Sequence, residues 1–276
     1  MQPVLDENTD LKCVILDIEG TTTAISFVKD ILFPYIRKNL KKYLETHWEE
    51  EQCQGDVQAL REQSINDSEE KKSSADKLQV VSPKILSNDE NLELTRQSVV
   101  DYVLFLMDAD RKVTSLKQLQ GHMWKQAYST GKVVGQIFED VLPAIKHWIS
   151  ERKKVYIYSS GSVEAQKLLF GHTAEGSILE FISGHFDTKI GAKVEVDSYC
   201  KIAKEIGCKN KEILFLTDVT REARPAKEAG CQVAVVLRPG NAPLSDEEIQ
   251  EFPHISSFSE LYAEGSGVEK AKLVKK

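Results

Sequence analysis

The chain has 276 residues, of which 41% are hydrophobic and 29% charged. This is enough apolar material for a folded core, so wholesale disorder is excluded, and the length indicates one or two domains. With 43 acidic and 36 basic residues, the net charge is −7, which disfavours binding of nucleic-acid phosphates over a broad face. No hydrophobic run approaches the ~20 residues of a membrane span.

The sequence also limits the compartment and the partners. The five cysteines are scattered without a Cys-x-x-Cys pair, which argues against a disulfide framework and a structural zinc site. The N-terminal residues lack the basic and hydrophobic regions of a secretory signal. We therefore expect a cytoplasmic protein without nucleic-acid or membrane partners. Four lysines within residues 270–276 leave an additional nuclear location open. No heptad pattern or hydrophobic stripe stands out, so we expect a monomer.

The first half of the chain begins with one strand and continues with helical patterns. Residues 11–16 form a continuous apolar run, which is typical of a strand buried on both faces. Hydrophobic residues then recur at helical spacing from Phe27 to Leu44, and helical patterns return between residues 99 and 149. We interpret residues 62–93, rich in Ser, Asp, Glu, Lys and Asn, as a long, partly disordered surface loop.

The second half alternates between strands and helices. Strand-like runs lie at residues 155–158, 213–217 and 232–237, with a weaker one at 181–186, and helical patterns lie at 163–170, 199–206 and 222–228. This alternation predicts a parallel α/β sheet. We expect a core of residues 11–23 and 135–262, a helical cap of residues 24–134 inserted after the first strand, and a flexible tail at 263–276.

Polar residues follow the predicted strands at the edge where ligands bind in open α/β sheets. They are Asp17 and Glu19 after the first strand, Ser159 and Ser160 after the next, Asp218 after residues 213–217, and Lys193 before a helix. Carboxylates that converge at one edge suit Mg²⁺, and a lysine with hydroxyls suits a phosphoryl group. A carboxylate can also attack phosphorus, and a second one can act as acid and base.

For some of the polar residues near these strand ends, a simpler interpretation or a rival residue exists. Ser159 and Ser160 could cap the helix that begins near residue 163. Lys189 is a rival of Lys193, which we prefer because it lies just before the predicted helix. Glu222 is equally consistent with hydrogen bonding to the site and with a plain acid at a helix N-terminus.

The spacing of these residues resembles the haloacid dehalogenase superfamily. The DIEGT segment that begins at Asp17 is similar to its first motif, Asp-x-Asp-Gly-Thr, with Glu19 in place of the second aspartate. Ser159, Lys193 and the Thr217–Asp218 pair match the second, third and fourth motifs in order. The resemblance implies a three-layer Rossmann-like core with a parallel sheet, and a cap inserted after the first strand.

Longer segments, among them DIEGTTT, YIYSSGS, DVTREA and VVLRPGNA, resemble the enolase-phosphatases of methionine salvage. The resemblance implies that 2,3-diketo-5-methylthiopentyl-1-phosphate is enolised and then dephosphorylated to acireductone and phosphate. It implies that Asp17 is the nucleophile and Glu19 the general acid and base. One Mg²⁺ per subunit would be held by the Asp17 carboxylate, the Glu19 main-chain carbonyl and the Asp218 carboxylate. Ser159, Ser160 and Lys193 would bind the substrate and its phosphoryl group.

Two other functions remain as alternatives. A phosphatase of another small phosphate ester would carry the same motifs, because the cap selects the organic part of the substrate. A phosphorylated receiver domain also places acids, a hydroxyl and a lysine at strand ends. Receivers have about 120 residues and need no large helical insertion. The sequence therefore favours an enzyme.

Overall fold

The computed structural model describes residues 10–73, 82–87 and 91–262. The chain divides into two compact units, a core unit of Met1–Val28 with Val134–Lys276 and a cap unit of Lys29–Val133. The flexible tail predicted at residues 263–276 lies outside the described residues. The same is true of residues 74–81 and 88–90 of the predicted loop.

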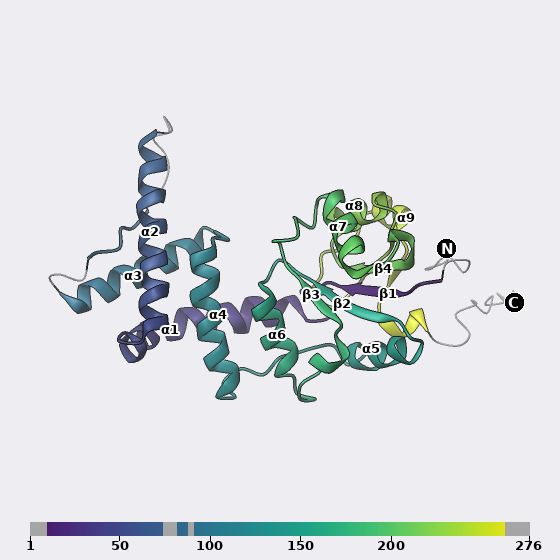
Figure 1. Ribbon diagram of the computed structural model, residues 1–276, viewed down its shortest axis with the longest axis horizontal. Helices are drawn as coiled ribbons and strands as arrows, with labels where there is room; N and C mark the ends of the chain where they lie inside the picture. Colours follow the sequence, from purple (N-terminus) through teal and green to yellow (C-terminus); the bar gives the residue numbers. More distant parts are fainter. Residues whose placement is uncertain (1–9, 74–81, 88–90, 263–276) are drawn as a thin grey trace, which may run out of the picture. The chain divides into compact units, whose positions relative to one another are not determined.

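The core unit is built on a six-stranded parallel sheet with the strand order β3-β2-β1-β4-β5-β6. Figure 1 labels the strands β1 to β4 of this sheet. Its strands are β1 (Cys13–Leu16), β2 (Lys154–Tyr158), β3 (Gly184–Phe186), β4 (Ile213–Thr217), β5 (Gln232–Val236) and β6 (His254–Ile255). Its helices are α5 (Val141–Ser150), α6 (Val163–Gly171), α7 (Val196–Ile206), α8 (Thr220–Glu228) and α9 (Asp246–Glu251). The predicted parallel α/β sheet is confirmed.

The central strands are hydrophobic throughout because both of their faces are covered. Successive side chains of a strand point to opposite faces. Ile15 and Phe215 pack in one cluster with Tyr199 of α7 and Ala223 of α8, and α5 and α6 cover the other face (Figure 1). Every residue of β1 and β4 is buried. The continuous apolar runs in the sequence have this physical cause.

The register of the sheet brings the ends of three strands together. Leu16 at the end of β1 is paired with Ile157 of β2 on one side and Leu216 of β4 on the other. The chain runs from β1 outward to β2 and β3, and then returns to β4 on the opposite side of β1. Asp17 therefore follows the strand at which the strand order reverses, where ligands bind in open α/β sheets.

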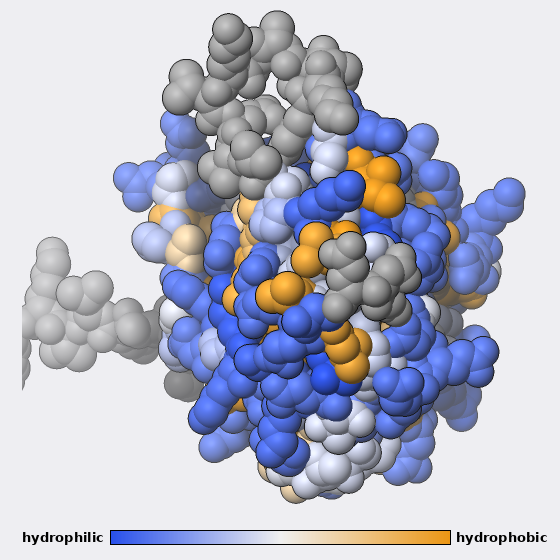
Figure 2. All heavy atoms as spheres, turned by 90° about the vertical axis from the view of Figure 1, so that its left-hand side faces the viewer, coloured by the Kyte–Doolittle hydropathy of each residue, from blue (hydrophilic) through white to orange (hydrophobic). Residues whose placement is uncertain are grey.

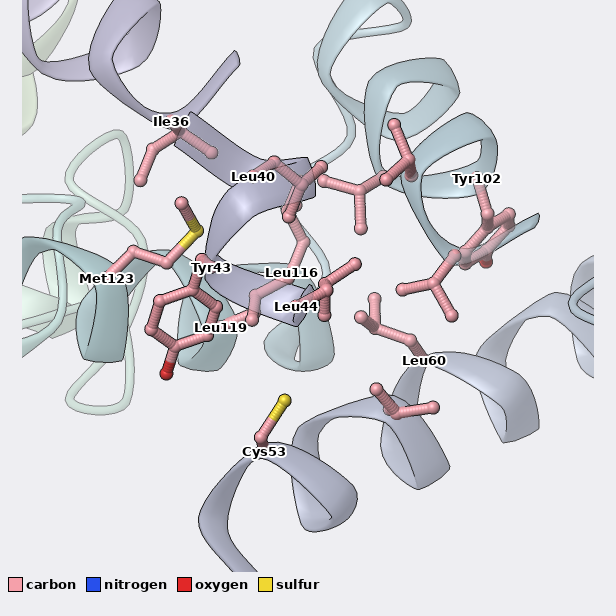
Figure 3. Close-up of a cluster of buried hydrophobic side chains, with 14 of the residues drawn as sticks. Ile36, Leu40, Tyr43, Leu44, Cys53, Leu60, Tyr102, Leu116, Leu119 and Met123 are labelled. Carbon is pink, nitrogen blue, oxygen red and sulfur yellow. The ribbon is translucent and has the colours of Figure 1, made fainter. Parts of the chain in front are cut away.

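The cap unit is helical, as predicted for the insertion after the first strand. It contains α1 (Phe33–His47), α2 (Glu51–Ser73), α3 (Leu92–Asp108) and α4 (Thr114–Ser129), preceded by a π-helical turn at Phe27–Leu32. Its buried hydrophobic cluster draws side chains from all four α-helices (Figure 3). No strand occurs in the described residues of this unit.

The predicted surface loop at residues 62–93 is wrong over its first part, because residues 62–73 continue helix α2. The buried stripe of this helix turns from apolar to polar there, so hydrophobic spacing no longer marks it. The Asp67 carboxylate is 2% exposed and accepts hydrogen bonds from the Tyr102 hydroxyl (2.9 Å) and the Arg111 guanidinium (3.1 Å). Paired polar groups thus replace hydrophobic packing along this part of α2.

No helix within the described ranges is long and apolar enough to cross a membrane. The face that Figure 2 shows is mainly hydrophilic, and hydrophobic side chains are scattered over it between polar ones. All five cysteines are free thiols.

Candidate active site

Asp17 is held rigidly at the end of β1. Its carboxylate is buried, with Oδ1 2.7 Å from the Lys193 Nζ and accepting the Ile18 N–H at 2.7 Å. The Thr217 hydroxyl lies 3.1 Å from Asp17 Oδ2. Two neighbouring strand ends and a lysine therefore fix both oxygens of one carboxylate.

Lys193 lies between two acids. Its side chain is 8% exposed, and Nζ is 2.7 Å from Asp17 Oδ1 and 2.5 Å from Glu222 Oε2. Burial alone would lower the pKa of Lys193. The two carboxylates, Asp17 and Glu222, raise it by more than burial lowers it, so the pKa lies above its ordinary value. Burial and the charge of Asp17 raise the pKa of Glu222, and Lys193 opposes this. Lys189, the rival of Lys193, is exposed.

Glu222 was consistent with two roles, and its contacts favour hydrogen bonding to the site. Besides Lys193, the Thr217 hydroxyl lies 3.1 Å from Glu222 Oε2. The single proton of that hydroxyl is shared between Glu222 and Asp17. Glu222 therefore helps to fix the lysine and the hydroxyl that contact Asp17.

The loop that carries Lys193 is fastened by two buried tyrosines. The Tyr158 hydroxyl donates to the Gly191 carbonyl at 2.9 Å, and the Tyr199 hydroxyl lies 2.7 Å from the Lys193 carbonyl. Gly191 has a φ of +148°, and a Cβ there would lie 2.1 Å from Ser198 Oγ. Only glycine allows this close approach, which lets the chain turn Lys193 into the core.

Asp218 adds a second carboxylate, half-buried, to this edge of the sheet. It lies against Gly20, where a Cβ would be 2.2 Å from Asp218 Oδ2. Burial, and then the charge of Asp17, raise the pKa of Asp218 to about 7. Asp218 Oδ1 is buried and has no hydrogen-bond partner among the described residues.

These features fit a hard divalent cation. The charge of Asp17 raises the pKa of Asp218, and one Asp218 oxygen is buried without a partner among the described residues, so this pair of carboxylates needs more positive charge than Lys193 alone supplies. Oxygen ligands of this kind suit Mg²⁺. Within the described residues, no three His, Cys, Asp or Glu side chains are grouped to hold a metal. A cation here therefore needs main-chain oxygen as well.

Glu19 lies in the tight loop after β1. The Ile18 carbonyl accepts the N–H groups of Thr21, Thr22 and Thr23 at 2.9–3.1 Å, and the backbone of Glu19 bridges to Thr23. The Glu19 side chain is exposed, in contrast to the buried Asp17. The loop thus presents one acid toward the sheet edge and the other toward solvent.

Ser159 and Ser160 extend from β2 at the same edge. Ser159 is buried, and its Oγ accepts the Gly161 N–H at 3.2 Å, whereas Ser160 is exposed. The cap of α6 is Ser162, whose Oγ accepts the Ala165 N–H at 3.3 Å. Ser159 and Ser160 therefore do not cap the helix.

Gln166 was not singled out from the sequence, although it braces this serine segment. Its buried Nε2 donates to the Gly161 carbonyl at 2.9 Å and to the Phe186 carbonyl at 2.8 Å. His185 Nδ1 lies 3.2 Å from Gln166 Oε1. The only signal in the sequence is a polar residue on the buried face of a helix, which is a weak one.

The structure thus places the buried Asp17 and Lys193 and the half-buried Asp218 in one cluster, with Ser159 directly after the adjacent strand and Glu19 in the loop that follows β1. A carboxylate cluster with a lysine at the switch point of a parallel sheet is suited to phosphoryl transfer. The chain matches the haloacid dehalogenase-like hydrolases over residues 11–230. Fold and site therefore define a hydrolase of this class.

Similar proteins narrow the class. Over 90% of its length, the chain is 55% identical to enolase-phosphatase E1 of Branchiostoma floridae, covering 82% of that protein. Over 93% of its length, it is 53% identical to enolase-phosphatase E1 of Danio rerio, covering 96% of it. The crystal structure of the UTR4 protein of Saccharomyces cerevisiae is similar, with a TM-score of 0.68, 30% identity and coverage of 90% of this chain and 98% of that one. The chain belongs to the enolase-phosphatase E1 family.

Proposed function

We propose that this enzyme, an acireductone synthase, enolises 2,3-diketo-5-methylthiopentyl-1-phosphate and then removes its phosphate, as a step of methionine salvage. The observation that carries the proposal is the Asp17 carboxylate, buried at the end of β1 and paired with Lys193 beside the second carboxylate of Asp218. Membership of the enolase-phosphatase E1 family supports the combination of the two reactions.

In the phosphatase half, Asp17 acts as the nucleophile. One of its oxygens attacks phosphorus, the bond from phosphorus to the substrate oxygen breaks, and the leaving oxygen takes a proton from Glu19. Glu19 then removes a proton from a water molecule that attacks the aspartyl-phosphate, which releases phosphate and restores Asp17. The exposed side chain of Glu19 supports this role, because it can meet both water and the leaving group.

Lys193 and a bound Mg²⁺ would supply the positive charge around the phosphoryl group, and two serines would add hydrogen bonds. Lys193 neutralises negative charge beside Asp17, and Ser159 and Ser160 donate hydrogen bonds to phosphoryl oxygens. One Mg²⁺ would be held by the carboxylates of Asp17 and Asp218 and the main-chain carbonyl of Glu19. Bound there, it would supply charge that stabilises the phosphoryl oxygens and acidifies the substrate C–H beside a polarised oxygen.

In the enolase half, a base must remove a carbon-bound proton before phosphate leaves. Glu19 is our first candidate, because the same carboxylate then carries a proton for the leaving oxygen. A residue of the cap unit is the second candidate. We further propose that the enzyme is a cytoplasmic monomer, with a nuclear pool as the alternative location.

The proposal is tested by comparing substrates. The wild-type enzyme is given the diketo phosphate or a simple alkyl phosphate, each with Mg²⁺ and with a chelator. We expect the diketo phosphate to have the higher kcat/KM, enol to form before phosphate, and both products to need Mg²⁺. Equal or better hydrolysis of the simple ester without enol formation would favour the alternative, a phosphatase of another small ester.

A further inference from the structure

The segment after β5 reaches back to the loop that carries Asp17 and Glu19. Asn241 Nδ2 donates to the Gly20 carbonyl at 2.9 Å and to the carbonyl of Val236, the last residue of β5, at 3.1 Å. Arg238 Nε donates to the Thr21 carbonyl at 3.1 Å. Two side chains from one segment therefore tie two successive loop residues to the sheet.

Arg238 is built into the interior of the core unit. It is 8% exposed, and its guanidinium lies 4.4 Å from the ring centre of Phe138 and 4.8 Å from that of Phe258. Its Nη1 lies 3.0 Å from Asp140 Oδ2 and donates to the Ser256 carbonyl at 3.1 Å. A buried cation with a carboxylate, carbonyl oxygens and two aromatic faces around it has little freedom to move.

The same network holds the loop at a third point. The Phe138 N–H donates to the Thr22 carbonyl at 2.9 Å, and the Phe138 ring also covers Arg238. The carbonyls of Gly20, Thr21 and Thr22 are thus each bound from outside the loop. The N–H groups of Thr21 and Thr22 instead bind the Ile18 carbonyl inside it.

These hydrogen bonds fix the distance between Asp218 and the loop that carries Asp17 and Glu19. Gly20 is the residue against which the Asp218 carboxylate packs, and Asn241 holds the Gly20 carbonyl. A catalytic group must be kept within about 0.5 Å of its productive position by the residues that support it. The VVLRPGNA segment supplies such support.

We propose that Arg238 and Asn241 are positioning residues, which hold the Asp17–Glu19 loop at the distance from Asp218 that cation binding and phosphoryl transfer require. Both act through the main-chain carbonyls of the loop. The catalytic part of this role rests on the proposed function, whereas the hydrogen bonds that hold the loop do not depend on it.

The test uses Asn241→Ala with Asn210→Ala as its matched control. Asn210 is also a half-buried asparagine whose Nδ2 donates to a main-chain carbonyl, that of Ala229 at 2.6 Å, outside the site. Asn241→Ala loses two amide-to-carbonyl hydrogen bonds, and Asn210→Ala loses one to a carbonyl and one to the Cys200 Sγ at 3.5 Å. We therefore expect small decreases of Tm in both variants. We expect only Asn241→Ala to bind Mg²⁺ and turn over substrate about 10- to 100-fold less well, with little change in KM.

Mg²⁺ affinity is measured by titration calorimetry, and kcat and KM by phosphate release from a simple ester. Neither measurement needs the diketone, so a wrong substrate assignment shows itself separately, as a wild-type enzyme that forms no enol. Arg238→Lys, which keeps the charge beside Asp140 but loses the planar fork, is a second variant and should show a smaller loss of the same kind. If Asn241→Ala and Arg238→Lys keep wild-type kcat and Mg²⁺ affinity while Tm falls as in Asn210→Ala, the positioning role is refuted.

Discussion

Replacing Gly20 by alanine tests the packing of the loop against Asp218. Gly20 has a φ of +75°, in the left-handed region, where a side chain costs roughly 1–2 kcal/mol. The added Cβ would lie 2.2 Å from Oδ2 and 2.5 Å from Cγ of Asp218. The carboxylate must therefore move by about 1 Å before an ordinary non-bonded separation is reached.

A displacement of this size has a predictable catalytic effect. A shift of about 1 Å in a catalytic group can reduce activity about 100-fold, and we expect that loss of kcat in Gly20→Ala. Gly207→Ala is the matched control, because Gly207 has a φ of +71° and no atom within 4 Å of its added Cβ. It carries the same backbone strain without the collision.

The assay pairs unfolding with turnover. Urea unfolding should show Gly207→Ala destabilised by roughly 1–2 kcal/mol and Gly20→Ala by at least as much, whereas phosphate release at saturating Mg²⁺ and substrate should fall only in Gly20→Ala. The reasoning is refuted if Gly20→Ala stays within about threefold of the wild-type kcat, or if Gly207→Ala loses as much activity.

Two further predictions concern the buried Lys193 and the half-buried His185. Lys193→Met should abolish phosphate release and destabilise the protein by about 3 kcal/mol, because it leaves Asp17 without its buried partner. Lys189→Met, at an exposed position, should change neither activity nor stability. Equal effects of the two variants would contradict the assignment of Lys193. Burial lowers the pKa of His185 from 6.5 to about 4. As the pH falls, His185 is therefore protonated in the unfolded chain before it is protonated in the folded one. The stability that neutral His185 contributes above pH 6.5 is lost toward pH 4. Urea unfolding at pH 7.5 and 5 should show a smaller loss in His185→Gln than in the wild type, and an identical loss would overturn this account.

The sequence predicted those helices and strands whose buried faces are hydrophobic, and it missed a helix segment whose buried face is polar. The strands around Asp17 and Asp218 were predicted because both faces are covered, which leaves unbroken apolar runs. Residues 62–73 were assigned to a loop because the stripe of α2 turns polar there. Asp67 is paired with Tyr102 of α3 and with Arg111 in the segment after it. Hydrophobic periodicity cannot detect a helix face that is buried by paired polar groups.

The same distinction applies to the site. Asp17 and Asp218 were predicted because each directly follows a strand. Gln166, Arg238 and Asn241 were not, because each acts by donating to main-chain carbonyls, and those contacts leave no periodic trace. Asn241 and Gly20 are 221 residues apart in the chain, so only the folded sheet brings them together.

The most direct test of the proposed reaction follows enol absorbance and phosphate release together, in one cuvette, for the wild type and Asp17→Asn with the diketo phosphate and Mg²⁺. We predict that the wild type forms enol and then releases phosphate, and that Asp17→Asn releases none. Enol that accumulates in the variant would place Asp17 in phosphoryl transfer alone, with another base in the first step. Phosphate release by Asp17→Asn at the wild-type rate, or a wild type that forms no enol, would contradict the account.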